Sequence, residues 1–301
     1  MEHAVRSPTH LMPALGARMY PPARHRGWAS GLHMCVLGAI LFWPAHPAAA
    51  ADSSTEKPSE SEKVFLLPIE FDFDSGAANG DAFIARLLPV NSLIVRETWK
   101  LVNVALVSLA DAPGGVPGFP GNPQPIPGEK VFGLADFTDA IFYTPTKSKG
   151  LMWGVGGMFG FPTATNDVLG SGKWSAGPAV RLGYQSGPWR LGLLAGNRWS
   201  FAGDSDRAEV NQLMVRGLIR CRLGKGWFFI YAPIITANWN ASSGQRWLVP
   251  LGGGIGKSFK FRPTPLNISL QAYGNALKPD GAPDSVFRIA FGIPFRLPGR
   301  P

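Results

Sequence analysis

The stretch Phe287-Arg288-Ile289-Ala290-Phe291-Gly292-Ile293-Pro294-Phe295 decides the fold class, because large apolar residues occupy every second position. The positions between them hold Arg, Ala, Gly and Pro. Successive side chains of a β-strand point to opposite faces. This stretch therefore predicts a strand with one apolar face and one polar or small face.

The same alternation recurs along the chain from Val64 onward. In the region 211–222, for example, Leu213 and Val215 alternate with Gln212 and Arg216. About twelve strand-like segments can be counted in this way. They begin near residues 64, 82, 97, 131, 151, 174, 189, 210, 227, 246, 266 and 285.

The connections between these segments alternate in length. Ser186-Gly187-Pro188 and Gly224-Lys225-Gly226 are tight turns. The connections that alternate with such turns are longer: 111–130, 162–173, 203–209, 240–245 and 277–284. Short turns at one end and long loops at the other are typical of an outer-membrane barrel. We therefore predict an all-β, transmembrane, antiparallel up-and-down β-barrel of about 12 strands. An even strand number would place both ends of the barrel on the periplasmic side.

Composition agrees with a barrel in lipid. Only 16% of the 301 residues are charged, against about 25% in ordinary soluble domains. Tryptophans at segment ends are expected to form the aromatic girdles of such barrels, and the candidates are Trp99, Trp153, Trp189, Trp199, Trp227, Trp239 and Trp247. A soluble sandwich or lipocalin-like barrel would show the same alternation with the apolar face inside. That alternative stays open at the level of sequence.

The first fifty residues resemble an export signal. Arg24 and Arg26 precede the apolar run 28–43, and small residues follow up to Ala50. The run is short for a membrane helix, which needs about 20 apolar residues, although an N-terminal anchor is the alternative. We predict a signal peptide at 1–50, a polar leader at 51–63, the barrel at 64–296 and a tail at 297–301.

Loss of this signal would remove every histidine, since all five lie before residue 47. Cys35 would leave too, so that Cys221 stands alone. Such a chain cannot use a Ser–His or Cys–His nucleophile or form an internal disulfide. Removing residues 1–50, with four Arg and one Glu, lowers the formal net charge from +9 to +6. We predict no enzyme activity, no cofactor and no metal.

The polar strand faces hold the main candidate site. In a membrane barrel they would line the lumen, and the candidates are Arg86, Arg181, Arg190, Arg198, Arg216, Arg220, Arg222, Arg288, Glu70, Asp72 and Asp136. These residues could form an internal ion-pair network, or a basic pore lining that favours anions. Charged residues of the outer loops are weaker candidates for binding a divalent ion or lipopolysaccharide: Asp167, Lys173, Asp204, Asp206 and Glu209.

Three blocks in the middle third carry a family resemblance. They are Gly133-Leu134-Ala135-Asp136 with Phe142-Tyr143-Thr144-Pro145; Pro162-Thr163-Ala164-Thr165 with Leu169-Gly170-Ser171-Gly172-Lys173-Trp174; and Trp199-Ser200, Ala202-Gly203-Asp204 and Val210-Asn211-Gln212. In this order they resemble a bacterial family of outer-membrane β-barrel transporters that carries the label neuromedin U. The family is grouped with the MetA-pathway proteins of phenol degradation.

The resemblance implies outer-membrane location and transport of small molecules, with no established catalytic residues. Two departures stand out: Ala135 replaces a glycine of the first block, and residues 297–301 follow the aromatic Phe295 of the last segment.

Taken together, the sequence predicts passive passage of small, anionic or aromatic solutes through an arginine-rich lumen. The alternatives are a closed structural barrel and a lipid-modifying enzyme. The expected partners are outer-membrane lipid, lipopolysaccharide and a small solute. Nucleic acid is not expected, because the basic residues are dispersed along an exported chain.

Overall fold

The computed structural model describes residues 63–78, 80–113, 130–147, 150–261 and 265–297. The predicted signal peptide and nearly all of the predicted leader and tail lie outside these residues. The strands are β1 (Lys63–Ser75), β2 (Ala82–Leu87), β3 (Val90–Arg96), β4 (Trp99–Ala112), β5 (Val131–Leu134), β6 (Phe137–Pro145), β7 (Leu151–Phe161), β8 (Lys173–Ser186), β9 (Trp189–Gly203), β10 (Asn211–Gly224), β11 (Trp227–Tyr231), β12 (Ile234–Asn238), β13 (Trp247–Phe259), β14 (Leu266–Leu277) and β15 (Ser285–Leu297). Two short 3-10 helices are η1 (Asp167–Leu169) and η2 (Ser243–Gln245). Among the described residues, no helix has the length and apolarity needed to cross a bilayer.

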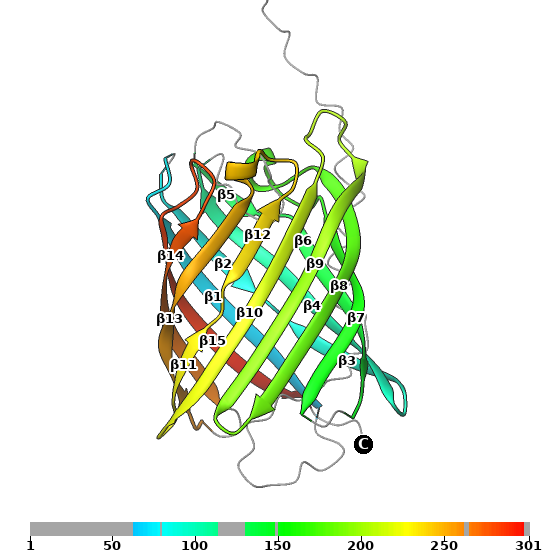
Figure 1. Cartoon of the computed structure of the whole chain (residues 1–301), viewed down its shortest axis with the longest axis vertical. Coiled ribbons are helices and arrows are strands. Elements are labelled where there is room, and N and C mark those ends of the chain that lie inside the picture. Colours follow the sequence, from blue (N-terminus) through cyan, green and yellow to red (C-terminus); the bar gives the residue numbers. More distant parts are fainter. Residues whose placement is uncertain (1–62, 79, 114–129, 148–149, 262–264, 298–301) are drawn as a thin grey trace, which may run out of the picture. The chain divides into compact units, whose positions relative to one another are not determined.

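The strands form one closed antiparallel barrel (Figure 1). The strands follow one another round the wall in chain order, except where two of them share one position, and β15 pairs with β1 from Lys63–Leu297 to Ser75–Ser285. Three of the twelve wall positions are shared by two strands, namely β2 with β3, β5 with β6, and β11 with β12. The predicted antiparallel barrel of about twelve strands is confirmed.

The three shared positions correct the expectation of continuous strands from 82, 131 and 227. Two of the breaks fall at Pro89 and Pro233, and proline cannot donate a backbone hydrogen bond within a sheet. The wall stays paired there, since the Pro233 carbonyl accepts from the Gly217 amide at 3.1 Å. At the third break, Thr165 provides the hydrogen-bond partners that a strand would supply. Its hydroxyl accepts from the Leu134 amide and its amide donates to the Leu134 carbonyl, each at 3.0 Å.

The two ends of the barrel differ in their connections. At one end, called the turn end, the connections are tight, such as 187–188 and 225–226; the Lys63–Leu297 pair lies there too. The opposite, long-loop end carries the stretches 162–172, 204–210, 239–246 and 278–284. Figure 1 shows the long-loop end at the top and strands strongly tilted to the barrel axis.

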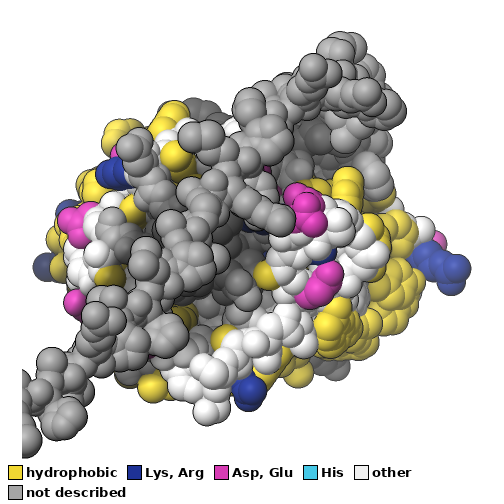
Figure 2. All heavy atoms as spheres, turned by 90° about the horizontal axis from the view of Figure 1, so that it is seen from above, with side chains coloured by type: hydrophobic (Ala, Val, Ile, Leu, Met, Phe, Trp, Pro, Cys, Tyr) yellow, Lys and Arg dark blue, Asp and Glu magenta, His cyan; other side chains and the backbone are white. Residues whose placement is uncertain are grey.

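The distribution of side chains is opposite to that of a soluble barrel. The buried inner face holds polar and charged residues such as Glu70, Asp72 and Arg198. Large apolar residues are exposed on the outer face: Phe73, Val155, Phe159, Val180, Leu182, Leu191, Leu193, Ile255, Leu270 and Phe287. Seen from the long-loop end, Figure 2 shows apolar side chains on the outer flank. Such a surface suits lipid, and a lipocalin-like arrangement is ruled out.

The barrel wall leaves no room for a side chain at Gly156. Gly156 lies between Phe142 of β6 and Ala179 of β8, and a Cβ atom there would overlap the Ile141 carbonyl group.

We expect Gly156→Ala to lower the free energy of unfolding by about 1–3 kcal/mol, as overpacking typically does. Urea titration of the refolded protein in micelles measures this change. Gly274→Ala is the matched control, because nothing lies within 4 Å of a Cβ atom at that position. Equal stability of the two variants would contradict the prediction.

Candidate functional site in the barrel interior

The strand register brings the predicted lumen residues to the inner face. Arg181 lies opposite Leu194, which lies opposite Arg216, so the three share one face. Arg198 lies opposite Gln212, and Arg190 opposite Arg220, on the same face of β9 and β10. Arg86 lies opposite Glu70, and Arg288 opposite Asp72. Arg222 lies at the turn end and is exposed.

Five of these residues form a charged cluster, defined as Glu70, Asp72, Arg86, Arg216 and Arg288. The Asp72 carboxylate accepts from Arg86 and takes two hydrogen bonds from Arg288, at 2.6 and 2.9 Å. The Glu70 carboxylate accepts from Arg216, with Arg288 3.7 Å away. Buried charges are costly unless paired and hydrogen-bonded, and here each carboxylate meets two guanidinium groups.

One link of the charged cluster spans the lumen. Arg216 belongs to β10 and Glu70 to β1, and four wall positions separate these strands along the shorter path round the barrel. The Arg216–Glu70 ion pair therefore crosses the interior and narrows it at this point.

The charged cluster and its neighbours also supply hydrogen-bond partners to the backbone at the strand break at Ala232-Pro233. Arg288 donates to the Ala232 carbonyl at 2.8 Å, and the Ala232 amide donates to the Tyr273 hydroxyl at 3.0 Å. Tyr273 in turn donates to Gln271 Oε1 at 2.5 Å. Backbone groups freed from the sheet thus find partners inside the barrel, as buried amides and carbonyls require.

Arg198 lies outside the charged cluster, where its hydrogen-bond partners are neutral and the Asp136 carboxylate is near enough to interact with it electrostatically. Its side chain is almost fully buried and donates to Gln212 Oε1 at 2.8 Å and Thr138 Oγ1 at 3.3 Å. Among the described residues, neither Arg198 nor Arg181 has a carboxylate within ion-pair distance. Hence these two guanidinium groups lie outside the ion pairs of the charged cluster.

Part of the inner face is apolar, which the sequence did not indicate. Phe142 and Met158 are fully buried and pack with Val102, Ala179 and Met214. These residues come from β4, β6, β7, β8 and β10, whereas the carboxylates of the charged cluster belong to β1. The lumen is therefore amphipathic in cross-section. Met158 and Met214 lie at inward positions of segments with alternating residues, so the strand register would have assigned them to the inner face.

Asp136, a predicted lumen-lining residue, is engaged by one connection of the long-loop end. Its carboxylate accepts from the Ser171 amide and hydroxyl, both at 2.7 Å, and from the Ala164 amide at 3.2 Å. Asp136 therefore fixes the connection 162–172 instead of facing solute. Leu169 of this connection packs on inward residues at the long-loop end, among them Ile84 and Ala110.

Several of the outer-loop candidates take part in contacts that join two connections. Arg207 donates to the carbonyls of Asp167, at 2.8 Å, and Gly170, at 2.5 Å. Buried Lys173 pairs with Glu209 at 2.8 Å, and hydrogen bonds from Lys173 and then Ser200 hold the pKa of Glu209 below its usual value.

Asp204 Oδ1 accepts from the Asp206 amide at 2.9 Å, as in a local turn. Within the described ranges, no three Asp, Glu, His or Cys side chains gather to hold a metal. Arg207 and Ser171 were not among the predicted site residues.

The candidate tryptophans lie at both ends of the wall. Trp99, Trp189 and Trp227 begin strands at the turn end, and Trp153 lies in the first residues of β7 at the same end. Trp99 stacks there on Tyr143, at 4.4 Å between ring centroids. Trp199, Trp239 and Trp247 lie at the long-loop end, where Trp239 and Trp247 meet edge to face at 5.5 Å. Two separated aromatic bands match the two interfaces of a bilayer.

Comparison with solved structures places this architecture among known barrels. The COG4313 outer membrane channel from Pseudomonas putida F1 superposes with a TM-score of 0.55 at 13% identity, over 82% of this chain and 100% of that chain. The fold is that of an outer-membrane barrel. The NanC porin gives a TM-score of 0.46 at 14% identity, over 77% and 100% of the two chains. No family model and no curated protein matches the chain, so the family resemblance stays a prediction.

We expect Asp136→Asn to release the connection 162–172, because an amide cannot accept at both of its ends. Hydrogen–deuterium exchange in micelles should quicken in peptides covering 162–172. Asp167→Asn is the control, since the exposed Asp167 contributes only its backbone carbonyl to Arg207. Unchanged exchange in the Asp136 variant would contradict this role.

We expect Arg288→Met to lower the free energy of unfolding by about 3–5 kcal/mol, because it leaves buried Glu70 and Asp72 short of a partner. Arg181→Met, which breaks no described ion pair, should cost clearly less. Urea denaturation of both variants measures the difference, and a larger loss for Arg181→Met would refute the assignment.

Proposed function

We propose that this protein is a channel of the bacterial outer membrane that lets small anionic solutes cross passively through an arginine-rich lumen. The observation that carries the proposal is the positive charge on the inner face of a barrel with an apolar outer face. Export through the predicted signal at 1–50 would deliver the chain to that membrane.

Charge on the inner face supports the preference for anions. Glu70 and Asp72 are engaged by Arg86, Arg216 and Arg288. Arg181 and Arg190 add positive charge, and Arg190 is held by the neutral Gln185 at 3.2 Å. Rings of basic side chains favour anions in pores. The charged cluster is the narrow part of the proposed path.

The apolar part of the inner face suits solutes that also carry a ring or a short chain. Phe142, Met158 and Met214 offer contact area for apolar atoms, while the arginines offer partners for an acidic group. Small aromatic acids combine both features. This solute class belongs to the proposal.

A closed structural barrel is the second candidate. It is favoured by the Arg216–Glu70 pair, which crosses the interior, and by the packing of Phe142 and Met158 against side chains of other strands.

Reconstitution in planar bilayers tests the proposal. We expect anion-selective conductance, and we expect Arg181→Glu to move the reversal potential in a salt gradient toward cation selectivity. Lys225→Glu is the matched control, since exposed Lys225 sits in the turn after β10, outside the lumen. Silent bilayers, together with no solute release from liposomes, would favour the closed barrel. An equal shift in both variants would contradict an arginine-lined path.

A further inference from the structure

A row of inward-facing residues crosses four neighbouring strands near the turn end and is called the cationic row. It consists of Lys100 of β4, Thr144 of β6, Gly154 of β7 and Arg181 of β8. Lys100 lies opposite Thr144, and Gly154 lies opposite Arg181. A Cβ atom at Gly154 would overlap the Thr144 hydroxyl and lie 3.0 Å from Arg181 Cγ. Because Gly154 has no side chain, the hydroxyl and the arginine stem can approach each other.

The two cations of the cationic row lack an acidic partner. Within the part of the chain that the structure describes, no carboxylate lies within ion-pair distance of Lys100 or Arg181, and neither charged group donates a hydrogen bond. Both residues are partly exposed, and they are near enough to interact electrostatically. Two like charges without a counter-charge repel each other, and an anion between them would relieve that repulsion.

Thr144 supplies a hydroxyl that is not otherwise used. The residue is 3% exposed, and among the described residues its Oγ1 has no hydrogen-bond partner. A buried hydroxyl without a partner is destabilising, and such groups are exceptions in folded proteins. Its position between two unpaired cations indicates a place for a ligand oxygen.

Apolar residues border the cationic row on two sides. Val102 of β4 and Phe142 of β6 lie opposite each other, two residues further into the barrel. Both are buried, so they close the deep side of the site. Leu194 of β9 lies opposite Arg181, packs against the same apolar cluster and is only partly buried. The site therefore combines cations and a hydroxyl with apolar contact area.

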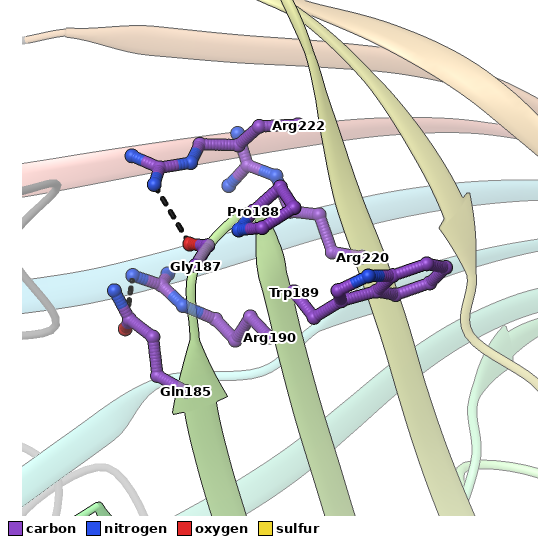
Figure 3. A pocket seen from close by; sticks show the side chains of 7 residues that line it. All are labelled: Gln185, Gly187, Pro188, Trp189, Arg190, Arg220 and Arg222. Atoms are coloured by element: carbon purple, nitrogen blue, oxygen red, sulfur yellow. Dashed lines mark hydrogen bonds between the residues drawn. The ribbon is translucent and has the colours of Figure 1, made fainter.

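Positive charge continues from the cationic row toward the rim. Arg190 lies nearer the turn end on β9, in a small pocket between β8, β9 and β10 (Figure 3). Gln185 Oε1 accepts from Arg190 at 3.2 Å and holds its side chain without opposing its charge. An anion that enters from the turn end would pass Arg190 before it reaches the cationic row, and positive charge along such a path attracts anions.

We propose that the cationic row binds the carboxylate of a small apolar acid. This inference rests on the proposed function, because it assigns a site in the lumen to the acid group of the solute. The two cations and the Thr144 hydroxyl would hold the carboxylate oxygens by charge-assisted hydrogen bonds, and Leu194 would contact the apolar body. A strongly hydrated dianion such as phosphate would have to lose water against apolar side chains, so a monocarboxylate is favoured.

Saturation-transfer NMR on the full-length chain in uncharged detergent micelles, with benzoate as the probe, tests the site. We expect Lys100→Met and Arg181→Met each to weaken benzoate binding by roughly fivefold or more, and Thr144→Val by roughly threefold or more. Lys257→Met is the matched control and should bind as the wild type does. Lys257 is a lysine of the same end, but it lies on the outer face beside Trp227, 5.0 Å from the centre of that ring.

Two further measurements separate a binding role from a structural role. Benzamide has the same ring without the charge, and we expect it to bind the wild type more weakly than benzoate by roughly fivefold or more. Lys100→Met and Thr144→Val remove groups that have no partner among the described residues, so their urea midpoints should equal or exceed that of the wild type. Lower midpoints in both variants would contradict this assignment.

Equal benzoate binding by the wild type, Lys100→Met and Thr144→Val, equal binding of benzoate and benzamide, or no binding at all would overturn the proposal. Binding in micelles does not require conduction, so the two proposals can fail separately. Benzoate binding by a protein that is silent in bilayers would exclude the channel and keep the site. Conducting bilayers with equal benzoate binding by all variants would exclude the site and keep the channel.

Discussion

The pairing of the first strand with the last closes the sheet, and the rest of the structure depends on that closure. β1 and β15 are paired from end to end, so the wall presents no open strand edge between them. A closed wall can face hydrocarbon without leaving backbone groups unsatisfied. The outer side chains can then be apolar, whereas the charged side chains of the inner face are buried and need partners.

The charged cluster and the Arg198 site solve that problem in different ways. Around Glu70 and Asp72, opposite charges meet at close range and link β1, β2, β10 and β15. Arg198 instead relies on neutral oxygens of Thr138 and Gln212. The first arrangement ties strands together across the interior, whereas the second leaves positive charge in place. The proposed anion path would need both, because fully neutralised arginines would not attract an anion.

The two ends of the barrel have separate roles in this arrangement. At the long-loop end, Asp136 and Arg207 bind the connection 162–172 to the wall and to the neighbouring connection. At the turn end, Arg190, Arg220 and Arg222 gather beside a tight turn. A solute passing through the proposed channel would meet a fixed polypeptide connection at the long-loop mouth.

Sequence alone predicted about twelve wall positions, the place of most strands and which arginines share a strand face, because the period of two is local and can be read without knowledge of the partner strands. It did not determine which face is inside, since alternation is the same in a soluble barrel. Tertiary structure decided that, together with the Arg216–Glu70 link, the apolar cluster around Met158 and the capture of Ser171 by Asp136. Each of these joins residues far apart in the chain, and only strand order, register and closure bring them within contact distance.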